Sequence, residues 1–473
     1  MGCAPVRLVL AGTCVVGLLG LSAPARATTD SGKVVNVSQS TPSGDVLSQN
    51  ETPIAINPHD PNNLITGGND WNYNDGCAVN TSFDGGRTWT ATLPDGYLPG
   101  ITKYTNDPAV PGTGAYDAGG DPTIAFSPDG HIAYYVCQAF NFTSPYQIAF
   151  LLNRSYDGGR TWQHRGLTTI SAGTSDGVSK GSNGQFPDHE NIHVDPTNGR
   201  IYLTWAQFNG NSTHSPVFVA ISDDHGDSFT VTQVTTSTIR NNQDQRIVTD
   251  PTGHAYLTFD NGIQGGKGTV MYVSKLDSTS MTWSTPFAFA TFTNPVCLFP
   301  PSCFTISGGQ FRAGGSYPAP AFANGRLYVA YADMKGLLGQ VYVQSAPGTD
   351  LVHWSTPVAV APSLGDQFQA ELSASPGGRL DLSFYDRGYS KNALVDVTYA
   401  SSRDSGASWH PQRVTPAGFD PAQWGVPSGS TFRPFLGDHN GIASTATTAQ
   451  LTWTGVSAPR PFNLDIFTAT VRP

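Results

Sequence analysis

The chain contains three glutamates, and all of them lie within copies of one recurring segment of eight residues. The other acidic residues are aspartates, and several of these open or precede the same segment. The copies are Glu51–Pro58, Asp121–Pro128, His189–Pro196, Asp244–Pro251, Ser316–Ala323 and Gln369–Pro376. Carboxylates that recur at one position of a repeat can meet in the folded protein. Paired carboxylates can supply the acid and the base or nucleophile of glycoside hydrolysis, and several together can bind Ca²⁺ through hard oxygen ligands.

A repeated strand-turn-strand unit accounts for this spacing. Each copy is an apolar run that ends in a turn, and a second β-rich run follows it. These second runs are Ile132–Val136, Ile201–Trp205, Ala255–Phe259, Leu327–Tyr331 and Leu380–Phe384. A seventh unit begins near Gly437 but lacks a fourth strand, which residues Lys33–Ser38 can supply. We therefore predict an all-β fold, a seven-bladed β-propeller closed by its two ends, with six blades as the alternative.

A second repeat has the chemistry of a β-hairpin turn. It occurs as Ser82–Trp89, returns almost unchanged as Ser155–Trp162, and keeps its outline in Ser222–Phe229 and Ser402–Trp409. Its aspartate can accept backbone N–H bonds across the turn, its glycine allows a positive φ, and its last residue is aromatic. These residue types indicate a role in folding rather than in catalysis.

The turn repeat resembles the Asp-box (BNR) repeat of sialidases and related secreted β-propeller proteins. The resemblance implies a propeller over most of the mature chain, with each Asp-box hairpin between the third and fourth strands of a blade. It also implies that these hairpins lie on the face away from the active site. Catalytic sialidases are six-bladed, whereas the first repeat of this chain indicates seven units.

Residues 1–27 have the pattern of a secretory signal peptide. Arg7 gives a positive start, an apolar run extends from Leu8 to Leu21, and Ala25–Ala27 form an A-x-A cleavage site. Lipid anchoring through Cys14 is the alternative. We expect a secreted protein whose residues 28–473 form one Asp-box β-propeller domain. Without the leader, 23 basic residues face 35 acidic ones, which argues against nucleic acid and anionic membranes as partners.

Four cysteines remain in the expected mature chain. An oxidising compartment favours disulfides, and the spacing of these cysteines does not match a zinc site. Cys297 and Cys303 enclose a short loop, and Cys77 and Cys137 form the other even pair. In a propeller, Cys77 and Cys137 would lie at the tops of adjacent blades. We therefore predict both disulfides.

In a propeller the first strands line the central channel, so the residues at their starts meet at its mouth. Asp188 and His189 open the third blade in this way, and Asp438 and His439 open the seventh. Two Asp-His pairs directed at one channel suit a shared cation or acid-base work near neutral pH. Asp188, Asp438 and His439 are therefore candidate ligands of Ca²⁺, although a hydrolase would require no cofactor. A structural role in the channel wall is the alternative.

The resemblance to sialidases implies how a substrate carboxylate would be bound. Sialidases use three arginines, and the candidates here are Arg246, Arg312 and Arg433. In the family, the first of these arginines belongs to a Phe-Arg-Ile-Pro motif at the first blade. Residues 51–54 of this chain read Glu-Thr-Pro-Ile instead, so that arginine is absent. The resemblance is therefore weaker for sialic acid than for the fold.

The same resemblance implies catalytic roles. A sialidase uses a tyrosine with a glutamate partner as nucleophile, and an aspartate as general acid and base. The candidates are Tyr317 and Tyr385 for the nucleophile, Glu190 and Glu371 for its partner, and Asp70 and Asp121 for the acid.

We therefore predict a secreted, exo-acting glycoside hydrolase of sialidase type, with its site at the top mouth of the channel and a glycan or glycoconjugate as its partner. One alternative is a polysaccharide lyase, in which a His or Tyr base and a cation act on a uronate C–H bond. The other is a non-catalytic propeller that binds carbohydrate or protein. An enzyme requires a carboxylate of raised pKa in a buried mouth, whereas a binding protein requires only an exposed aromatic platform.

Overall fold

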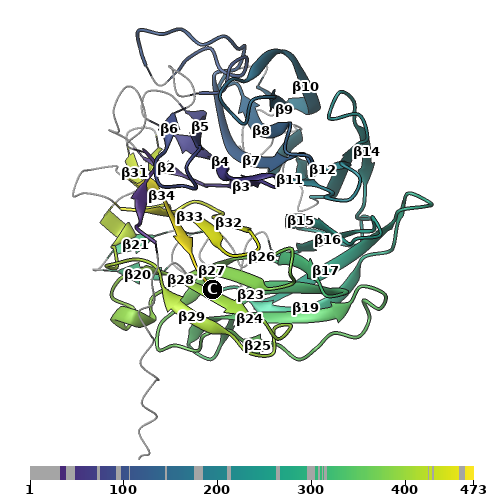
Figure 1. Cartoon of the computed structure of the whole chain (residues 1–473), viewed down its shortest axis with the longest axis vertical. Coiled ribbons are helices and arrows are strands. Elements are labelled where there is room, and N and C mark those ends of the chain that lie inside the picture. The colour runs from purple at the N-terminus through teal and green to yellow at the C-terminus, as the bar shows by residue number, and fades with distance from the viewer. Residues whose placement is uncertain are drawn as a thin grey trace, which may run out of the picture.

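The computed structural model describes most of the chain that follows the N-terminal segment (Figure 1). The described residues are 32–38, 48–71, 75–91, 97–105, 107–143, 146–174, 185–209, 215–262, 267–295, 304–306, 309–311, 313, 317–423, 426–428, 431–456 and 464–473. They form a seven-bladed, all-β propeller in which the sheets surround a central axis. The prediction of seven blades is confirmed, and the six-bladed alternative is wrong.

Each blade is a sheet of antiparallel strands, and its first strand lies nearest the axis (Figure 1). Blade 1 contains β2 (Gln49–Asn50), β3 (Ile54–Asn57), β4 (Asp60–Asp70), β5 (Gly76–Ser82) and β6 (Thr90–Ala91). Blade 2 contains β7 (Ala118–Phe126), β8 (Ala133–Phe140), β9 (Gln147–Ser155) and β10 (Gln163–Thr174). Blade 3 contains β11 (Gln185–Val194), β12 (Ile201–Asn209), β13 (Val217–Ser222) and β14 (Thr230–Gln233). Blade 4 contains β15 (Gln243–Thr249), β16 (Ala255–Asp260), β17 (Lys267–Asp277), β18 (Thr282–Trp283) and β19 (Phe287–Thr293).

The remaining blades follow the same plan. Blade 5 contains β22 (Ala319–Ala323), β23 (Arg326–Lys335), β24 (Leu338–Pro347) and β25 (Val358–Ala359). Blade 6 contains β26 (Gln367–Ala374), β27 (Leu380–Asp386), β28 (Asp396–Ser402) and β29 (His410–Arg413). Blade 7 contains β32 (Gly441–Ser444), β33 (Ala449–Gly455), β34 (Asp465–Val471) and β1 (Val35–Asn36). The other elements are the strand pairs β20 (Phe304–Ile306) with β21 (Gly309–Phe311) and β30 (Val426–Ser428) with β31 (Thr431–Arg433), and the 3₁₀ helices η2 (Gly388–Ser390) and η3 (Pro421–Gln423).

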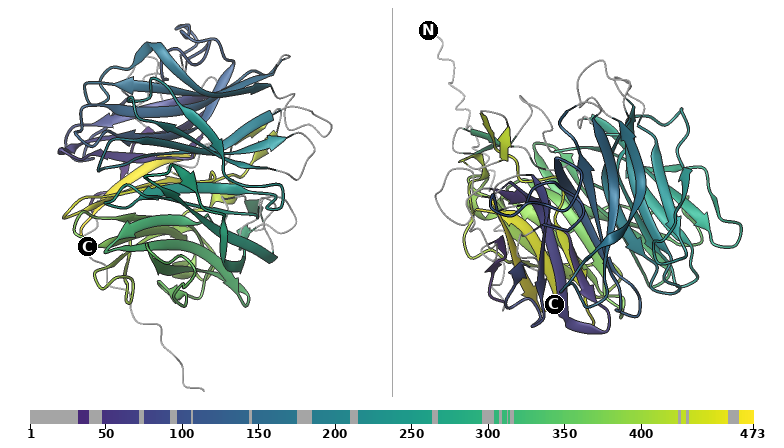
Figure 2. Two further views of the ribbon diagram at one scale, coloured as in Figure 1. Left: turned by 90° about the vertical axis from the view of Figure 1, so that its right-hand side faces the viewer. Right: turned by 90° about the horizontal axis from the view of Figure 1, so that it is seen from above.

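The hydrophobic core lies between neighbouring blades, whose sheets pack face to face (Figure 2). Trp205 of β12 illustrates this packing, because it meets Phe150 of blade 2 edge to face at 5.8 Å and stacks on Phe218 of its own blade at 5.5 Å. A strand covered on both faces needs apolar residues on both, which explains why the second strands read as continuous apolar runs. In β27 all seven residues are buried.

The two ends of the described chain close the ring. In the seventh sheet β1 pairs with β34, where Val35 faces Thr468 and Asn36 faces Phe467. The Ile466 N–H donates to Ser38 Oγ at 2.8 Å. This arrangement confirms the prediction that Lys33–Ser38 supplies the missing strand, and it leaves no open sheet edge at the seam.

The repeat turns join the third and fourth strands of blades 1, 2, 3 and 6. In the first of them, Asp84 Oδ1 accepts the Arg87 N–H at 3.0 Å and the Thr88 N–H at 2.9 Å. Gly85 has a φ of +77°, and its equivalents in the third and fourth copies are His225 at +58° and Ser405 at +60°. The turn therefore requires a left-handed backbone at this position but tolerates side chains other than glycine.

Cys77 of β5 and Cys137 of β8 form a disulfide between adjacent blades, with a Cα–Cα distance of 6.3 Å. The prediction of this pair is confirmed. Cys297 and Cys303 lie outside the described residues, so their pairing stays a prediction.

The predicted signal peptide, residues 1–27, also lies outside the described residues. Within the part of the chain that the structure describes, no helix has the length and apolar character needed to cross a membrane.

A buried ion pair connects blades 6 and 7. Arg379, which is 4% exposed, donates to both carboxylate oxygens of Asp381 at 2.8 Å. It also donates to the carbonyl oxygens of Thr445, Ala446 and Thr448, in the turn between β32 and β33, at 3.0–3.1 Å. Ser444 Oγ donates to Asp381 at 2.6 Å from the same neighbouring blade.

Replacing Arg379 with methionine should therefore lower the free energy of unfolding by about 3–5 kcal/mol, because the buried Asp381 carboxylate would lose its countercharge. Urea denaturation measures this change. The matched control is Arg200→Met, which breaks an ion pair to Asp223, whose side chain is 65% exposed, and should cost less than about 1 kcal/mol. Equal losses in the two variants would contradict the assignment.

Candidate functional site

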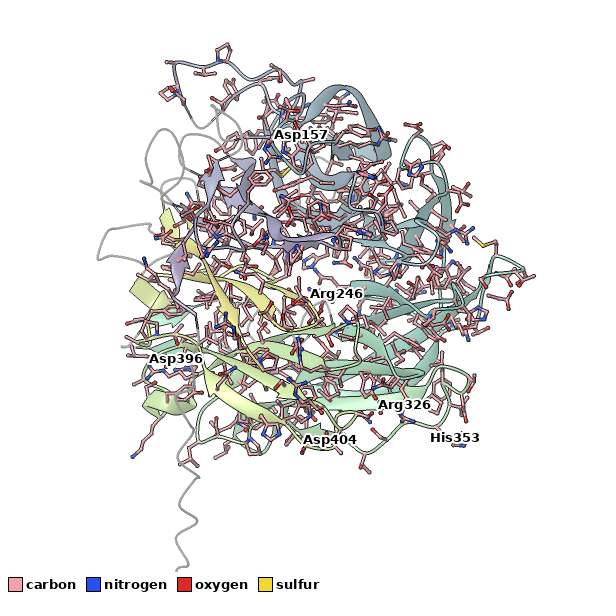
Figure 3. The ribbon with its side chains drawn as sticks, in the orientation of Figure 1. Asp157, Arg246, Arg326, His353, Asp396 and Asp404 are labelled. Atoms are coloured by element: carbon pink, nitrogen blue, oxygen red, sulfur yellow. A yellow bond between two sulfur atoms is a disulfide. The ribbon has the colours of Figure 1, made fainter. Side chains whose placement is uncertain are left out.

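The inner strands of all seven blades contribute to one cavity of about 240 Å³ on the propeller axis. Figure 3 shows Arg246 near the centre of the ring, whereas Asp157 and Asp404 lie toward its edge. The wall of the cavity is more polar than apolar, and its apolar residues include Ile124, Ile247 and Leu372. Its polar groups at the starts of the inner strands are His189, Glu190, Asp244, Arg246, Tyr317, Glu371, His439 and Asn440, and Thr123, Asn191, His193 and Gln245 also line it.

An unusual backbone conformation recurs where the inner strands begin. In six blades one residue there has a positive φ: Glu51 (+58°), Asp121 (+50°), His189 (+56°), Asp244 (+62°), Gln369 (+52°) and Gly437 (+96°). The strand register shifts at this point in blades 2, 3, 4 and 6. Such a bulge changes the direction of a side chain, and a left-handed residue other than glycine costs about 1–2 kcal/mol. Strain that recurs at one edge of a fold points to a functional site there.

His189 is the centre of the resulting cluster. Its Nδ1 lies 3.3 Å from Asp244 Oδ1, and its Nε2 lies 3.6 Å from Asp438 Oδ2 and 3.9 Å from Asp188 Oδ2. These three carboxylates come from blades 4, 7 and 3, so the channel mouth gathers residues more than 190 positions apart in the sequence. The side chains of His189 and Asp188 are 13% and 20% exposed, which leaves the cluster partly open to solvent.

Asp121 of blade 2 joins this cluster through Asn69 and Glu51 of blade 1. Asn69 Nδ2 donates to Asp121 Oδ1 at 3.3 Å, and Asn69 Oδ1 accepts the Asp121 N–H at 2.6 Å. Asn69 also donates to the Glu51 carboxylate. The other Glu51 oxygen accepts the Asp438 N–H at 2.9 Å, which links blade 1 to blade 7. We refer to Glu51, Asp121, Asp188, His189, Asp244 and Asp438 as the mouth cluster.

The carboxylates of the mouth cluster hold protons unequally. Burial, together with the charges of Asp121 and Asp438, raises the pKa of Asp188 to about 6. Burial and the charges of Asp260 and Asp438 raise the pKa of Asp244 well above its ordinary value. For Asp121, burial acts in the same direction, but a hydrogen bond shared with Glu51 and the charges of His189 and His439 outweigh it and lower the pKa. Near neutral pH the cluster therefore contains both proton-carrying and ionised carboxyl groups.

An ion pair crosses the cavity between blades 4 and 6. Arg246 donates through both terminal nitrogens to the Glu371 carboxylate, one of these bonds measuring 2.8 Å. Burial raises the pKa of Glu371, and the Arg246 guanidinium opposes part of that shift. The Tyr317 ring lies beside this pair, with Arg246 Cζ 5.9 Å from its centroid and the His189 ring 5.9 Å away, edge to face.

Glu190 is a buried acid beside the cluster. Its residue is 5% exposed, and neither carboxyl oxygen accepts a hydrogen bond of good geometry among the described residues. Burial and the charge of Asp121 raise its pKa well above the ordinary value, and the backbone N–H groups of Glu190 and Gln138 oppose only part of this shift. His439 is neutral near pH 7, because burial and the Arg246 charge lower its pKa to about 4.

The structure separates the sequence candidates into groups. Glu190, Tyr317, Glu371, Arg246 and His439 line the cavity, and Asp121, Asp188 and Asp438 lie in the mouth cluster. Asp70 and Tyr385 lie apart from the cavity lining. Asp70 Oδ1 accepts from Gln49 at 3.2 Å, and Tyr385 donates to the Thr454 carbonyl oxygen at 2.7 Å between blades 6 and 7. Arg312 lies outside the described residues, as does the side chain of Arg433.

For the predicted Ca²⁺ ligands, Asp188 and Asp438 approach each other through His189, whereas His439 lines the cavity. Among the described residues no three His, Cys, Asp or Glu side chains are arranged as a metal-binding group.

Sequence reasoning placed His189 in an Asp-His pair at the channel mouth, but it did not select Asp244 and Asn69 as site residues. A signal for Asp244 was present, because it occupies the same position of the repeat as Glu51 and Asp121. His189 also stands at this position, and all four residues share a positive φ. Asn69 lies near the end of β4, a position that the propeller geometry directs to the mouth, and it acts through contacts with other strands.

Comparison with known proteins gives a likeness in fold. No protein-family model and no curated protein sequence matches the chain. Similar solved structures include a protein of unknown function from Dyadobacter fermentans, at 14% identity and a TM-score of 0.44 over 75% of this chain and 94% of that one. An α-L-arabinofuranosidase from Fusarium graminearum is 12% identical, with a TM-score of 0.44 over 74% of this chain and 92% of that one. A leech intramolecular trans-sialidase is 12% identical, with a TM-score of 0.46 over 79% of this chain and 70% of that one.

These neighbours include glycoside hydrolase β-propellers.

The Glu190 carboxyl generates a pH-dependent prediction for Glu190→Gln. Because its pKa is raised on folding, folded protein holds a proton that unfolded protein releases, and stability falls as pH rises from the unfolded pKa of about 4.3 through the folded value. An uncharged amide avoids that loss. Glu190→Gln should therefore have a higher Tm than the unsubstituted protein at pH 8, and the difference should shrink toward pH 4.

Differential scanning calorimetry at the two pH values provides the measurement. The matched control is Glu371→Gln, which leaves Arg246 without its carboxylate and should lower the Tm at pH 8. A Tm difference for Glu190→Gln that is the same at both pH values would refute the buried, proton-carrying state of Glu190.

Proposed function

We propose that this protein is a glycoside hydrolase whose active site is the mouth cluster and the cavity below it. The observation that supports this proposal is the convergence of Asp188, Asp244 and Asp438, from three blades, on the His189 imidazole at 3.3–3.9 Å. A fold gains no stability from crowding carboxylates in a partly buried place. Glycoside hydrolysis, by contrast, requires at least two carboxyl groups in different protonation states beside one bond.

The two roles follow from the surroundings of each carboxyl group. Asp188 has a pKa of about 6 and a side chain that is 20% exposed, so it can reach a substrate while it carries a proton. We assign it as the general acid that protonates the leaving oxygen. Asp121 has a lowered pKa and is oriented by two hydrogen bonds to Asn69, and we assign it as the ionised carboxylate opposite.

The size of the cavity favours action on one terminal sugar. Its volume of about 240 Å³ is below the range of about 300–1,000 Å³ typical of pockets for drug-sized ligands. Tyr317 lies beside Arg246 and His189. The Tyr317 side chain would orient the sugar ring of the substrate by contacting one face of that ring.

The charge of the site favours a neutral sugar over sialic acid. Arg246 already binds both oxygens of Glu371, so a sialic acid carboxylate would have to displace a buried partner. Tyr317 and Glu371 both line the cavity and remain part of the proposal as residues that orient the substrate. We also propose secretion, which agrees with the Cys77–Cys137 disulfide.

A polysaccharide lyase is a second candidate because of one specific contact. The His189 ring meets the edge of Tyr317 at 5.9 Å, with Arg246 adjacent. A histidine base, a tyrosine acid and an arginine are the groups that proton abstraction from a uronate would use.

Asp188→Asn should reduce kcat by about 10²–10⁴-fold, because an amide cannot donate the required proton. The measurement is release of reducing sugar or unsaturated uronate from neutral, sialylated and uronate-rich glycans, with and without EDTA. We expect reducing sugar from a neutral glycan. The matched control is Asp223→Asn, an exposed residue of a repeat turn, which should keep full activity.

Tyr317→Phe separates the two candidate reactions. It should lower hydrolysis modestly, through KM, whereas it should abolish the formation of unsaturated uronate if the protein is a lyase. Absence of any product in folded protein, with glycan binding retained, would refute catalysis and leave a carbohydrate-binding propeller.

A further inference from the structure

A second cavity, of about 260 Å³, lies at the other end of the inner strands. Its lining includes Gly130 and His131, which belong to the turn after β7, whereas Asp121 of the mouth cluster lies near the start of that strand. The cavity sits between the repeat turns of blades 1 and 2. It therefore opens away from the catalytic mouth and is separate from the site proposed above.

Two aromatic side chains at this cavity are exposed to solvent. Phe83 is 39% exposed and Tyr156 is 53% exposed, and both line the cavity. They occupy the same place in their turns, directly after the serine and before the aspartate. The buried aromatic of each turn is a different residue, Trp89 or Trp162, so Phe83 and Tyr156 are not the folding anchors.

The other two copies of the turn show that the position between the serine and the aspartate does not require an aromatic residue. It holds Asp223 in blade 3 and Arg403 in blade 6. The turns nevertheless keep the same hydrogen bonds, since Ser222 Oγ and Ser402 Oγ each accept a glycine N–H at 2.9 Å, as Ser82 Oγ does. The chain therefore exposes two aromatic rings beside one cavity where the fold accepts charged residues.

The charged groups around the rings are two carboxylates, Asp60 and Asp157, and one guanidinium, Arg160. The Arg160 guanidinium lies over the Phe83 ring, with Cζ 3.6 Å from its centroid, and its Nη1 donates to the Asp157 carbonyl oxygen at 2.9 Å. Asp60 and His131 complete the rim of the cavity. One cation thus faces carboxylates close by, which favours an uncharged ligand.

We propose that this cavity is a second carbohydrate-binding site, which holds a neutral polysaccharide on the face opposite the catalytic mouth. Exposed aromatic rings can stack against the apolar faces of sugar rings, and a rim of amide, carboxylate, imidazole and guanidinium groups can bind the hydroxyl groups. The cavity has the size of a small ligand, whereas a stable protein interface needs about 800 Å² per partner. The site anchors the polymer and takes no part in bond cleavage.

The chain itself supplies the test variants. Phe83→Asp with Tyr156→Arg places in blades 1 and 2 the residue types that blades 3 and 6 already accept at the same position. The double variant should therefore fold, with an unchanged urea midpoint. The matched controls are Asp223→Ala and Arg403→Ala, which alter the same position on the other two turns.

The probes are a soluble neutral glucan, a xylan, an arabinan and anionic polygalacturonate, each cast in a native gel. We expect at least one neutral polysaccharide to retard the unsubstituted protein, and the apparent Kd to rise about tenfold or more in the double variant, equivalent to the loss of about 1.4 kcal/mol. The two alanine controls and Asp188→Asn should be retarded like the unsubstituted protein. Retardation by polygalacturonate alone, no retardation by any probe, or equal retardation of the double variant would overturn the proposal.

Loss of binding with intact catalysis would separate this site from the proposed active site. Activity of the double variant on a small soluble glycoside should be unchanged, because the cavity lies at the far end of the inner strands. Failure of the catalytic proposal would remove activity from all proteins alike and leave the retardation experiment unaffected.

Discussion

Closure of the ring between blades 7 and 1 is the constraint on which the site depends. The pairing of β1 with β34 completes the last sheet, and side chains continue the seam inward, where Thr452 Oγ1 donates to the Thr52 carbonyl oxygen at 3.0 Å. At the channel the seam ends with Glu51, which accepts the Asp438 N–H at 2.9 Å. Asp438 then faces His189 across the mouth at 3.6 Å. A small opening of the seam would move Asp438 away from the imidazole and release Glu51 from Asp121.

The mouth cluster is held together at a cost that other contacts must offset. Each left-handed residue stores about 1–2 kcal/mol, and burial of several carboxyl groups adds a desolvation penalty. The penalty is limited because His189 is shared among three carboxylates, Asn69 binds Asp121 twice, and Arg246 neutralises Glu371. The inter-blade cores, illustrated by Trp205 between Phe150 and Phe218, supply the stability that this arrangement consumes.

Periodic features of the fold could be predicted from the sequence because each is repeated. The apolar second strands and the turns containing Asp84 and Asp404 recur along the chain, so the blade count and the closing strand at Lys33–Ser38 followed from counting units. The contacts within the site could not be predicted in the same way. His189 meets Asp438 only because a left-handed residue redirects its side chain, and an L-residue in that conformation has no sequence signature. The Arg246–Glu371 pair could be predicted from the sequence more readily. Each of its members stands two residues after the left-handed residue of its blade.

In each repeat there is one position whose backbone setting is kept from copy to copy while its side chain varies. Such positions indicate where functional side chains can occur. At the start of the inner strand the left-handed backbone is kept, while the residue changes among Glu51, Asp121, His189, Asp244 and Gln369. In the turn the serine and aspartate are kept, while the residue between them changes among Phe83, Tyr156, Asp223 and Arg403. A position whose backbone is set by its neighbours can change its side chain at little cost in stability. The side chains at these positions can therefore be selected for ligand binding. The two ends of the inner strands can then bind different parts of one polymer.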